Sequence, residues 1–169
     1  MPRASLIAVL AAAIVAGACT STSTPSGGPS PTGAGGTTSL DACSLLPRSL
    51  VESTLPGAVT HVRELAAADF KSPPSSDQVS CAYVTNGHYG QLTVSTWPMS
   101  RSAYQARYVT RDPINTRSVP NLGEDARFST CGNLAVYANG RVLQLAIQFA
   151  DCNALRRLVS LGRVALRQL

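Results

Sequence analysis

The dipeptide Asn139-Gly140 constrains the fold of this 169-residue chain more than any other feature of its sequence. It joins two runs that are rich in apolar residues, at residues 133–138 and 141–149. Asn-Gly is the preferred two-residue type I′ turn, because both of its residues tolerate positive φ. The pattern therefore predicts a β-hairpin, and the turn predicts its register.

In this register Leu134 lies opposite Leu145, and Val136 lies opposite Leu143. Successive side chains of a strand point to opposite faces, so both pairs belong to one apolar face. The remaining positions divide in the same way: Ile147 and Phe149 extend the apolar face, while Gln144 and Gln148 fall on the other.

A second hairpin is predicted earlier in the chain, from residues 80–85 and 90–97, with its turn between them. Residues 58–65 alternate only in part and are ambiguous. Two stretches rich in Pro, Ser, Asn and Gly are predicted to be loops, at residues 71–78 and 113–128.

Helices are predicted at both ends of the folded part. Pro47 fits the first turn of a helix that Pro56 and Gly57 stop. Residues 153–169 carry apolar side chains at steps of three and four, and Ser100 caps a short helix between the hairpins. The expected fold is α+β: an antiparallel sheet of two β-hairpins packed against an N-terminal and a C-terminal helix.

The first 18 residues resemble a lipoprotein signal peptide, because Arg3 precedes an uncharged run that ends in small residues before Cys19. As a helix, residues 4–18 would span only about 22 Å, short of a bilayer core of about 30 Å. Cys19 is therefore expected to carry a diacylglycerol that anchors the chain to the extracytoplasmic face of the cell membrane. Ordinary cleavage after Ala18 is the alternative.

Residues 19–39 hold almost only Ser, Thr, Pro and Gly, with no charge. Such a segment cannot bury enough apolar surface to offset the entropy of ordering it. We expect a flexible linker here and a globular domain at residues 40–169.

Five cysteines are present, so lipid attachment at Cys19 leaves an even number for disulfides. Cys131 falls opposite Gln148 in the predicted hairpin, and Cys152 follows as the chain enters the last helix. Both stand at the open end of this hairpin, which favours Cys131–Cys152 and leaves Cys43 for Cys81. Two other connectivities remain open. No C-x-x-C pair occurs, so neither a metal site nor a redox motif is expected.

The net charge of +5 is spread along the chain, with one cluster on the last predicted helix. Arg156, Arg163 and Arg167 fall opposite its apolar side. The plain interpretation is a solvated helix face, and the functional one is contact with anionic lipid headgroups or cell-wall polymers. An exported chain is not expected to bind nucleic acid, and a monomer is expected.

No catalytic motif is present. His88 stands in a predicted turn, His61 in the ambiguous segment, and neither is expected to be a base. Glu124 and Asp125 are adjacent, so on an extended chain they point apart and are expected to serve as turn and capping residues. Neither enzyme activity nor a cofactor is therefore expected.

The segments "DACSLLP", "CAY" and "LGEDARF" resemble those of a family of small actinobacterial cell-surface lipoproteins that carries a domain of unknown function. The resemblance covers most of residues 40–169. It implies an α+β domain with an antiparallel sheet and two disulfides, and it supplies no catalytic residues. A more distant likeness is to the disulfide-bonded extracellular sensor domains of actinobacterial serine/threonine kinases, although this chain has no kinase domain.

These observations favour a non-enzymatic binding or sensor-like module that meets an envelope protein, a glycan or an anionic lipid. The alternatives are a carrier of lipids or small ligands, which needs a large apolar cavity, and an envelope hydrolase. A hydrolase would need a recessed cluster that joins Glu124 or Asp125 to a histidine.

Overall fold

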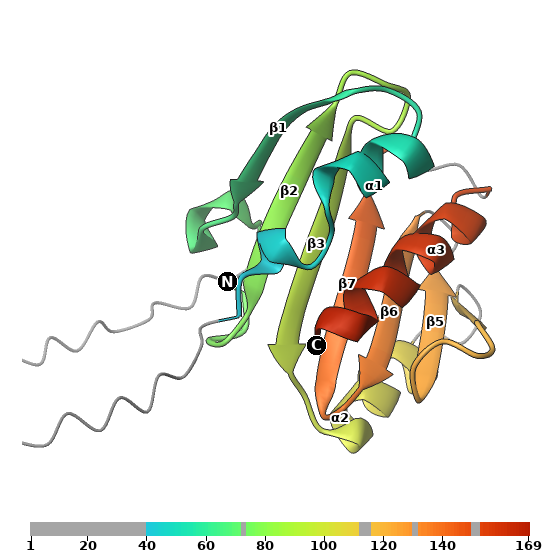
Figure 1. Ribbon diagram of the computed structural model, residues 1–169. Helices are drawn as coiled ribbons and strands as arrows, with labels where there is room; N and C mark the ends of the chain where they lie inside the picture. Colours follow the sequence, from blue (N-terminus) through green and yellow to red (C-terminus); the bar gives the residue numbers. More distant parts are fainter. Residues whose placement is uncertain (1–39, 72–73, 112–115, 130–131, 150–152) are drawn as a thin grey trace, which may run out of the picture. The chain divides into compact units, whose positions relative to one another are not determined.

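A seven-stranded antiparallel sheet is the centre of the fold (Figure 1). The computed structural model describes residues 40–71, 74–111, 116–129, 132–149 and 153–169. The strand order is β1-β2-β3-β7-β6-β5-β4, so the two predicted hairpins, β2–β3 and β6–β7, lie side by side in the middle. The strands are β1 Val59–Glu64, β2 Val79–Thr85, β3 Gln91–Pro98, β4 Thr116–Ser118, β5 Asp125–Ser129, β6 Asn133–Ala138 and β7 Arg141–Ile147.

The register of the β6–β7 hairpin is the predicted one. Leu134 pairs with Leu145, and Val136 pairs with Leu143. Asn139 and Gly140 have φ angles of 52° and 72°, the left-handed conformation that a type I′ turn needs at both positions.

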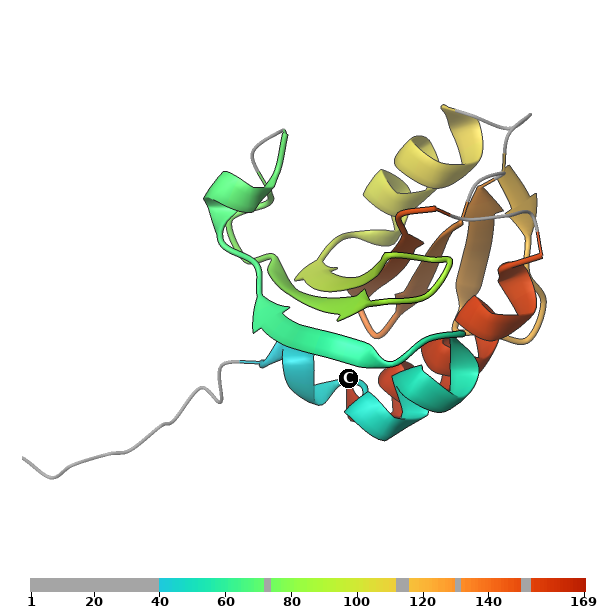
Figure 2. The ribbon, with the colours of Figure 1, turned by 90° about the horizontal axis from the view of Figure 1, so that it is seen from above.

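The helices lie on both faces of the sheet (Figure 2). Helices α1 (Arg48–Thr54) and α3 (Leu155–Ala165) cover one face, as predicted for the N-terminal and C-terminal helices. Helix α2 (Arg101–Gln105) lies on the other face and is capped by Ser100, whose side chain accepts a hydrogen bond from the amide of Ala103 at 3.2 Å. Short helical turns complete the fold: η1 Ala42–Ser44, η2 Ala67–Asp69, η3 Ala106–Thr110 and η4 Leu166–Gln168.

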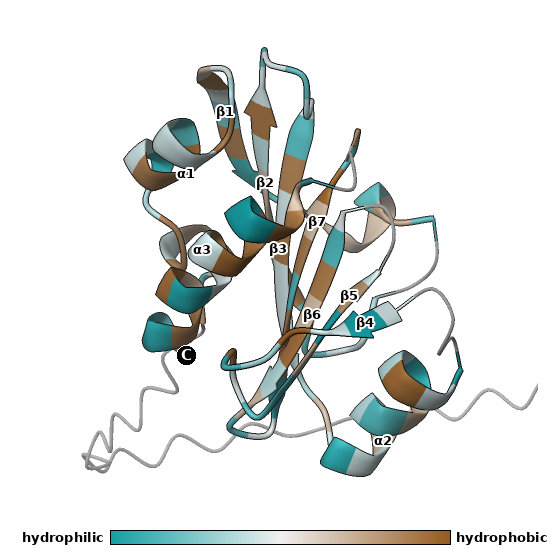
Figure 3. Cartoon of the chain, turned by 90° about the vertical axis from the view of Figure 1, so that its right-hand side faces the viewer, coloured by the Kyte–Doolittle hydropathy of each residue, from teal (hydrophilic) through white to brown (hydrophobic). Residues whose placement is uncertain are grey.

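The main core lies between the sheet and the α1–α3 layer. Helix α3 is amphipathic, with its apolar side on the sheet and its polar side outward (Figure 3). Leu158, Leu161 and Ala165 are fully buried there. Contacts within Thr38–Leu169 make this stretch one compact unit, which contains the whole described core, so we expect it to fold without the residues before it.

Three strands differ from the sequence prediction. The ambiguous segment forms β1, and the stretch predicted to be a loop contains β4 and β5. In β5, Ala126 and Phe128 are buried while their neighbours are only half-buried, which is the alternation of a strand. This signal is short, and the surrounding Pro, Gly and Asn residues concealed it.

Cys43 and Cys81 form a disulfide, the pairing favoured from the sequence, with an S–S distance of 2.02 Å and Cα atoms 5.0 Å apart. Cys19, Cys131 and Cys152 lie outside the described residues, as do the signal peptide and linker predicted at residues 1–39. No helix within the described residues is long and apolar enough to cross a membrane.

Candidate functional site

The arginines predicted to meet an anionic surface are exposed on the outer side of the last helical segment. Arg156 and Arg163 belong to α3, and Arg167 follows in η4. We call these three residues the arginine strip. Their neighbour Arg157 differs, since its guanidinium donates to the carbonyl of Thr54 at 2.8 Å and therefore joins α3 to α1.

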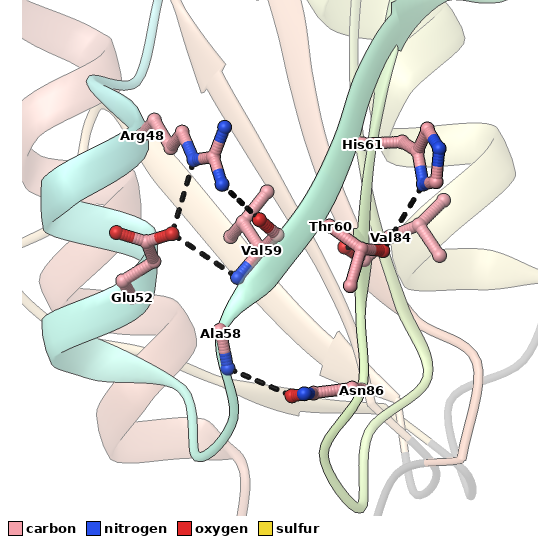
Figure 4. Close-up of polar contacts among 8 residues, drawn as sticks. All are labelled: Arg48, Glu52, Ala58, Val59, Thr60, His61, Val84 and Asn86. Atoms are coloured by element: carbon pink, nitrogen blue, oxygen red, sulfur yellow. Dashed lines mark hydrogen bonds and ion pairs between the residues drawn. The ribbon is translucent and has the colours of Figure 1, made fainter.

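Both histidines of the chain are exposed. His61 is exposed on β1, and its Nδ1 lies 3.2 Å from Oγ1 of Thr60 (Figure 4). His88 is exposed in the β2–β3 turn, with its ring centroid 5.4 Å from that of Tyr89. In the described parts of the chain, no carboxylate contacts either imidazole, so no acid–base pair is formed.

The carboxylate of Glu52 fixes the backbone at the start of β1. Oε1 of Glu52 accepts from Nε of Arg48 at 3.0 Å and from the amide of Val59 at 3.2 Å, while Arg48 also donates to the carbonyl of Val59 (Figure 4). The hydrogen bond from Arg48 lowers the pKa of Glu52 below its usual value. Ala58, one residue earlier, donates its amide to Asn86 at 2.9 Å. These contacts fix where β1 begins, which is a structural role.

Glu124 is a capping residue, as the sequence predicted, whereas Asp125 is the first residue of β5. Oε1 of Glu124 accepts from the amide of Asn139 at 2.9 Å and so caps the β6–β7 turn. Its other oxygen lies 3.5 Å from Arg101. Asp125 pairs instead with Arg127 at 3.1 Å.

A polar groove lies on the sheet face opposite α1 and α3. In β3, Leu92 and Val94 belong to the main core, so the alternating residues Thr93, Ser95 and Trp97 face the other side. A hollow of about 310 Å³ opens there, between the segment after η2 and the turn η3. It is lined by Phe70, Pro74, Ser75, Gln78, Thr93, Ser95, Trp97, Arg107, Gln144 and Ala146. We call it the sheet groove.

A smaller hollow of about 200 Å³ adjoins the sheet groove and shares Arg107 and Gln144 with it. Gln144 stands directly opposite Ser95 in the β3–β7 pairing. The two hollows together extend from β3 to β4 across the sheet, and Arg107 lines both of them.

The helix α2 and the turn η3 place Arg107 over the groove. Tyr104 is fully buried and donates its hydroxyl to the carbonyl of Ala135 at 3.0 Å, which fixes the helix against the sheet. Arg107 and Tyr108 follow three and four residues later, on the same helical face. Residues Ala106–Thr110 form a π-helical turn, a rare conformation that occurs frequently at functional sites.

The guanidinium of Arg107, an exposed residue, lies near two aromatic rings. Its central carbon lies 5.9 Å from the ring centroid of Trp97 and 5.5 Å from that of Tyr108. Cation–π contacts of this kind orient a guanidinium without neutralising its charge. Burial raises the pKa of Tyr108, with the charge of Arg107 opposing the shift, so Tyr108 remains a neutral phenol around pH 7.

The charge of Arg107 has no counter-charge in the described structure. No carboxylate of the described residues contacts it, and none lines either hollow. Arg127, the other arginine of the smaller hollow, is neutralised by Asp125. As far as the described residues line it, the groove is therefore a positively charged concavity with uncharged polar side chains on its floor.

The sheet groove was not predicted from the sequence. The hairpin register placed Gln144 on the non-core face of its strand, and the alternation of Thr93, Ser95 and Trp97 carries the same signal in β3. Nothing in the sequence, however, shows that β3 and β7 are neighbours or that Arg107 lies over them.

Metal binding finds no support in the described residues, since no group of three or more His, Cys, Asp and Glu side chains is gathered there. Comparisons of the chain with protein-family models, curated proteins and solved structures find no match.

Proposed function

We propose that this protein is a non-enzymatic binding module of the cell envelope, held at the extracytoplasmic face of the membrane by a lipid on Cys19, and that it binds an anionic ligand in the sheet groove. The observation that carries the binding function is Arg107, a cation that lies against Trp97 and Tyr108 at a concavity, with no acid among the described residues to neutralise it. An arginine fork in this setting favours carboxylate or phosphate oxygens.

The groove supports binding more than catalysis. Its lining offers Ser75, Ser95 and Thr93 as hydroxyl groups, but neither histidine of the chain is among the lining residues. A serine or threonine nucleophile needs an adjacent base to remove its proton. The described lining supplies no carboxylate or imidazole for this purpose.

A lipid carrier fits the groove less well. Acyl chains need a long apolar cavity, whereas a hollow of about 310 Å³ with Gln, Ser and Thr on its floor suits a small polar ligand. The space between the sheet and the α1–α3 layer is filled by the side chains of the core.

The anchor and the second disulfide belong to the same proposal. Cleavage before Cys19 and its acylation explain the apolar run and the uncharged linker, and they agree with the resemblance to actinobacterial lipoproteins. Cys131 and Cys152 are proposed to pair. In support, the amide of Ile147 donates to the carbonyl of Gly132 at 3.0 Å, which brings the residue after Cys131 to the end of β7.

Fractionation of cells that express the full chain tests the anchor. Wild-type protein is expected in the membrane fraction, with the mass of two acyl chains on its mature N-terminus, and Cys19→Ala is expected to lose both. Equal membrane retention of Cys19→Ala would contradict the anchor. Peptide mapping without reduction tests the second disulfide, and free thiols at Cys131 and Cys152 would contradict it.

Titration of the ¹⁵N-labelled unit Thr38–Leu169 with a digest of envelope polymers tests the binding function. We expect shifts in the amide signals of groove residues, and we expect Arg107→Gln to abolish them. Arg101→Gln is the matched control, because it removes the same charge from the same helical segment outside the groove. An absence of shifts in the groove, or equal shifts in Arg107→Gln, would contradict the proposal.

The arginine strip supports a second contact, with anionic lipid headgroups. Its three guanidinium groups are exposed, and no carboxylate of the described chain contacts them. A lipid-anchored domain meets headgroups continuously, and clustered basic residues are attracted to them. This contact would use the face opposite the sheet groove and would leave the groove free.

A further inference from the structure

The floor of the sheet groove carries hydroxyl groups that accept hydrogen bonds from neighbouring side chains. Nε2 of Gln78 donates to Oγ of Ser80 at 3.2 Å, and Ser80 donates to Oγ of Ser95 at 2.7 Å. In a parallel arrangement, Nε2 of Gln91 donates to Oγ1 of Thr93 at 3.0 Å. Ser95 and Thr93 accept in these bonds, so the proton of each hydroxyl remains available to a further acceptor.

The available hydroxyl of Ser95 is well buried, since this residue is only 4% exposed. A buried donor without an acceptor costs free energy, and a ligand oxygen in the groove would remove this cost. Nε1 of Trp97 is a buried donor with no partner in the described structure, and Trp97 also lines the groove. With the guanidinium of Arg107, the hydroxyl and indole groups give the lining several hydrogen-bond donors.

The charge of the lining fits a ligand with one negative charge. Arg107 is the unpaired cation of the described lining, while Arg127 is already paired with Asp125. A carboxylate carries one charge and matches the two-pronged geometry of a guanidinium. A phosphate monoester carries about −1.5 to −2 at neutral pH, so part of its charge would remain unbalanced.

The donors are spread over the floor of the groove. A ligand that satisfies them needs several acceptor oxygens on one rigid molecule. Thr93 and Ser95 are two residues apart on β3, a separation of about 7 Å, and Gln144 stands beside Ser95 on β7. A hollow of about 310 Å³ lies at the small end of the range for ligand sites. Phe70 adds an aromatic surface to its wall.

From these features, and resting on the proposed binding function, we infer that the sheet groove binds a carboxylated sugar, free or as a unit of a polymer. Its carboxylate lies against Arg107, and the ring and hydroxyl oxygens of the sugar accept from Ser95 and Thr93. Gln144, whose amide has no hydrogen-bond partner in the described structure, contributes both a donor and an acceptor to the sugar hydroxyls.

Titration of the unit Thr38–Leu169 with defined ligands tests this inference, followed by calorimetry and by ¹⁵N amide shifts. The acids are methyl glucuronoside, methyl galacturonoside and N-acetylmuramate. Their neutral partners are methyl glucoside, methyl galactoside and N-acetylglucosamine. N-acetyl-dialanine supplies an acyclic carboxylate, and inorganic phosphate a simple anion. At least one sugar acid is expected to bind ten times more tightly than its neutral partner and than both non-sugar anions, with shifts at Ser95, Arg107 and Gln144.

Two variants locate the contact. Arg107→Gln is expected to weaken binding of the sugar acid at least tenfold, while Arg101→Gln leaves it unchanged. Thr93→Val removes a hydroxyl at nearly constant shape and is expected to weaken binding about fivefold, provided that its amide spectrum shows the native fold. Undiminished affinity in Arg107→Gln would overturn the inference, and so would equal binding of N-acetyl-dialanine or phosphate.

The inference and the binding function can fail separately. If the envelope digest shifts groove signals while none of the three sugar acids does, the ligand class is wrong and the binding function stands. If neither the digest nor any acid reaches the groove, both are wrong.

Discussion

Cys43 and Cys81 are bonded to each other, and this disulfide ties η1 to β2 across a sequence separation of 38 residues. A cross-link of this length restricts the unfolded chain and is expected to stabilise the fold by about 4 kcal/mol on the chain-entropy model. The double variant Cys43→Ala/Cys81→Ala should lower the free energy of unfolding in urea by about this amount. A loss below about 1 kcal/mol would show that the disulfide does not contribute in this way.

Tyr83 fixes the same region, since its hydroxyl donates to the carbonyls of Leu46 at 2.7 Å and Cys43 at 2.9 Å. Burial, together with the negative charge of Asp41, raises the pKa of Tyr83 to about 12. A raised pKa means that the fold favours the neutral phenol. Its contribution is therefore complete below the unfolded pKa of about 10 and is lost as the pH rises toward 12.

This pKa shift predicts that the free energy of unfolding falls by an amount on the order of 2 kcal/mol between pH 9 and pH 12 from Tyr83 alone. Other groups, including Tyr104, whose pKa is also raised by burial, titrate in the same range. The test therefore measures the free energy of unfolding in urea at pH 9 and at pH 12, for the wild type and for Tyr83→Phe, and compares the change between the two pH values. The wild type should lose more stability than the variant, and parallel losses would refute the assignment to Tyr83.

Gly162 lies on the buried side of α3 and leaves room for one methyl group. A Cβ built there would lie 3.4 Å from Cδ2 of Leu134 and from Cδ1 of Leu145, a contact that small movements of the two methyl groups accommodate. Alanine is favoured over glycine within a helix by about 0.8–1 kcal/mol. Gly162→Ala should therefore raise the free energy of unfolding by about 0.5–1 kcal/mol.

The opposite change in stability is expected at a second glycine, Gly123. Gly123 has a φ of 63°, and a Cβ there would lie 2.6 Å from Cγ1 of Val136. Gly123→Ala should therefore destabilise the protein. Thermal unfolding of both variants checks the pair, and a destabilised Gly162→Ala would mean that the α3–sheet contact is tighter than its geometry indicates.

Local patterns predicted a large part of the fold. The Asn139-Gly140 turn specified the register of β6–β7, because a two-residue turn leaves no freedom in the pairing. The three- and four-residue periodicity specified α3. The strands β4 and β5 escaped prediction, because three and five residues between turn signals carry little periodicity.

The sheet groove could not be predicted for a different reason. Ser95 and Gln144 become neighbours only when the two hairpins join along β3 and β7. This pairing is between residues far apart in sequence, and no local turn specifies it. The position of Arg107 over Trp97 likewise follows from how α2 packs across the joined hairpins.

The arginine strip leads to a prediction about membrane binding without the lipid anchor. Each basic residue near an anionic bilayer contributes about 1 kcal/mol to the free energy of membrane binding. Three such residues therefore raise the partition constant roughly a hundredfold. The unit Thr38–Leu169 should therefore bind phosphatidylglycerol vesicles at low salt, and Arg156→Gln/Arg163→Gln/Arg167→Gln should weaken this binding by roughly that factor.

Single variants separate the position of a charge from its number. Arg163→Gln and Arg101→Gln remove one charge each, but Arg163 belongs to the strip on α3 and Arg101 lies on α2, across the sheet. Co-sedimentation should show about a fivefold loss for Arg163→Gln and little change for Arg101→Gln. Binding should vanish with neutral phosphatidylcholine vesicles and decline as salt screens the charges. Equal losses for the two variants would mean that net charge, and not the arginine strip, attracts the domain to the membrane.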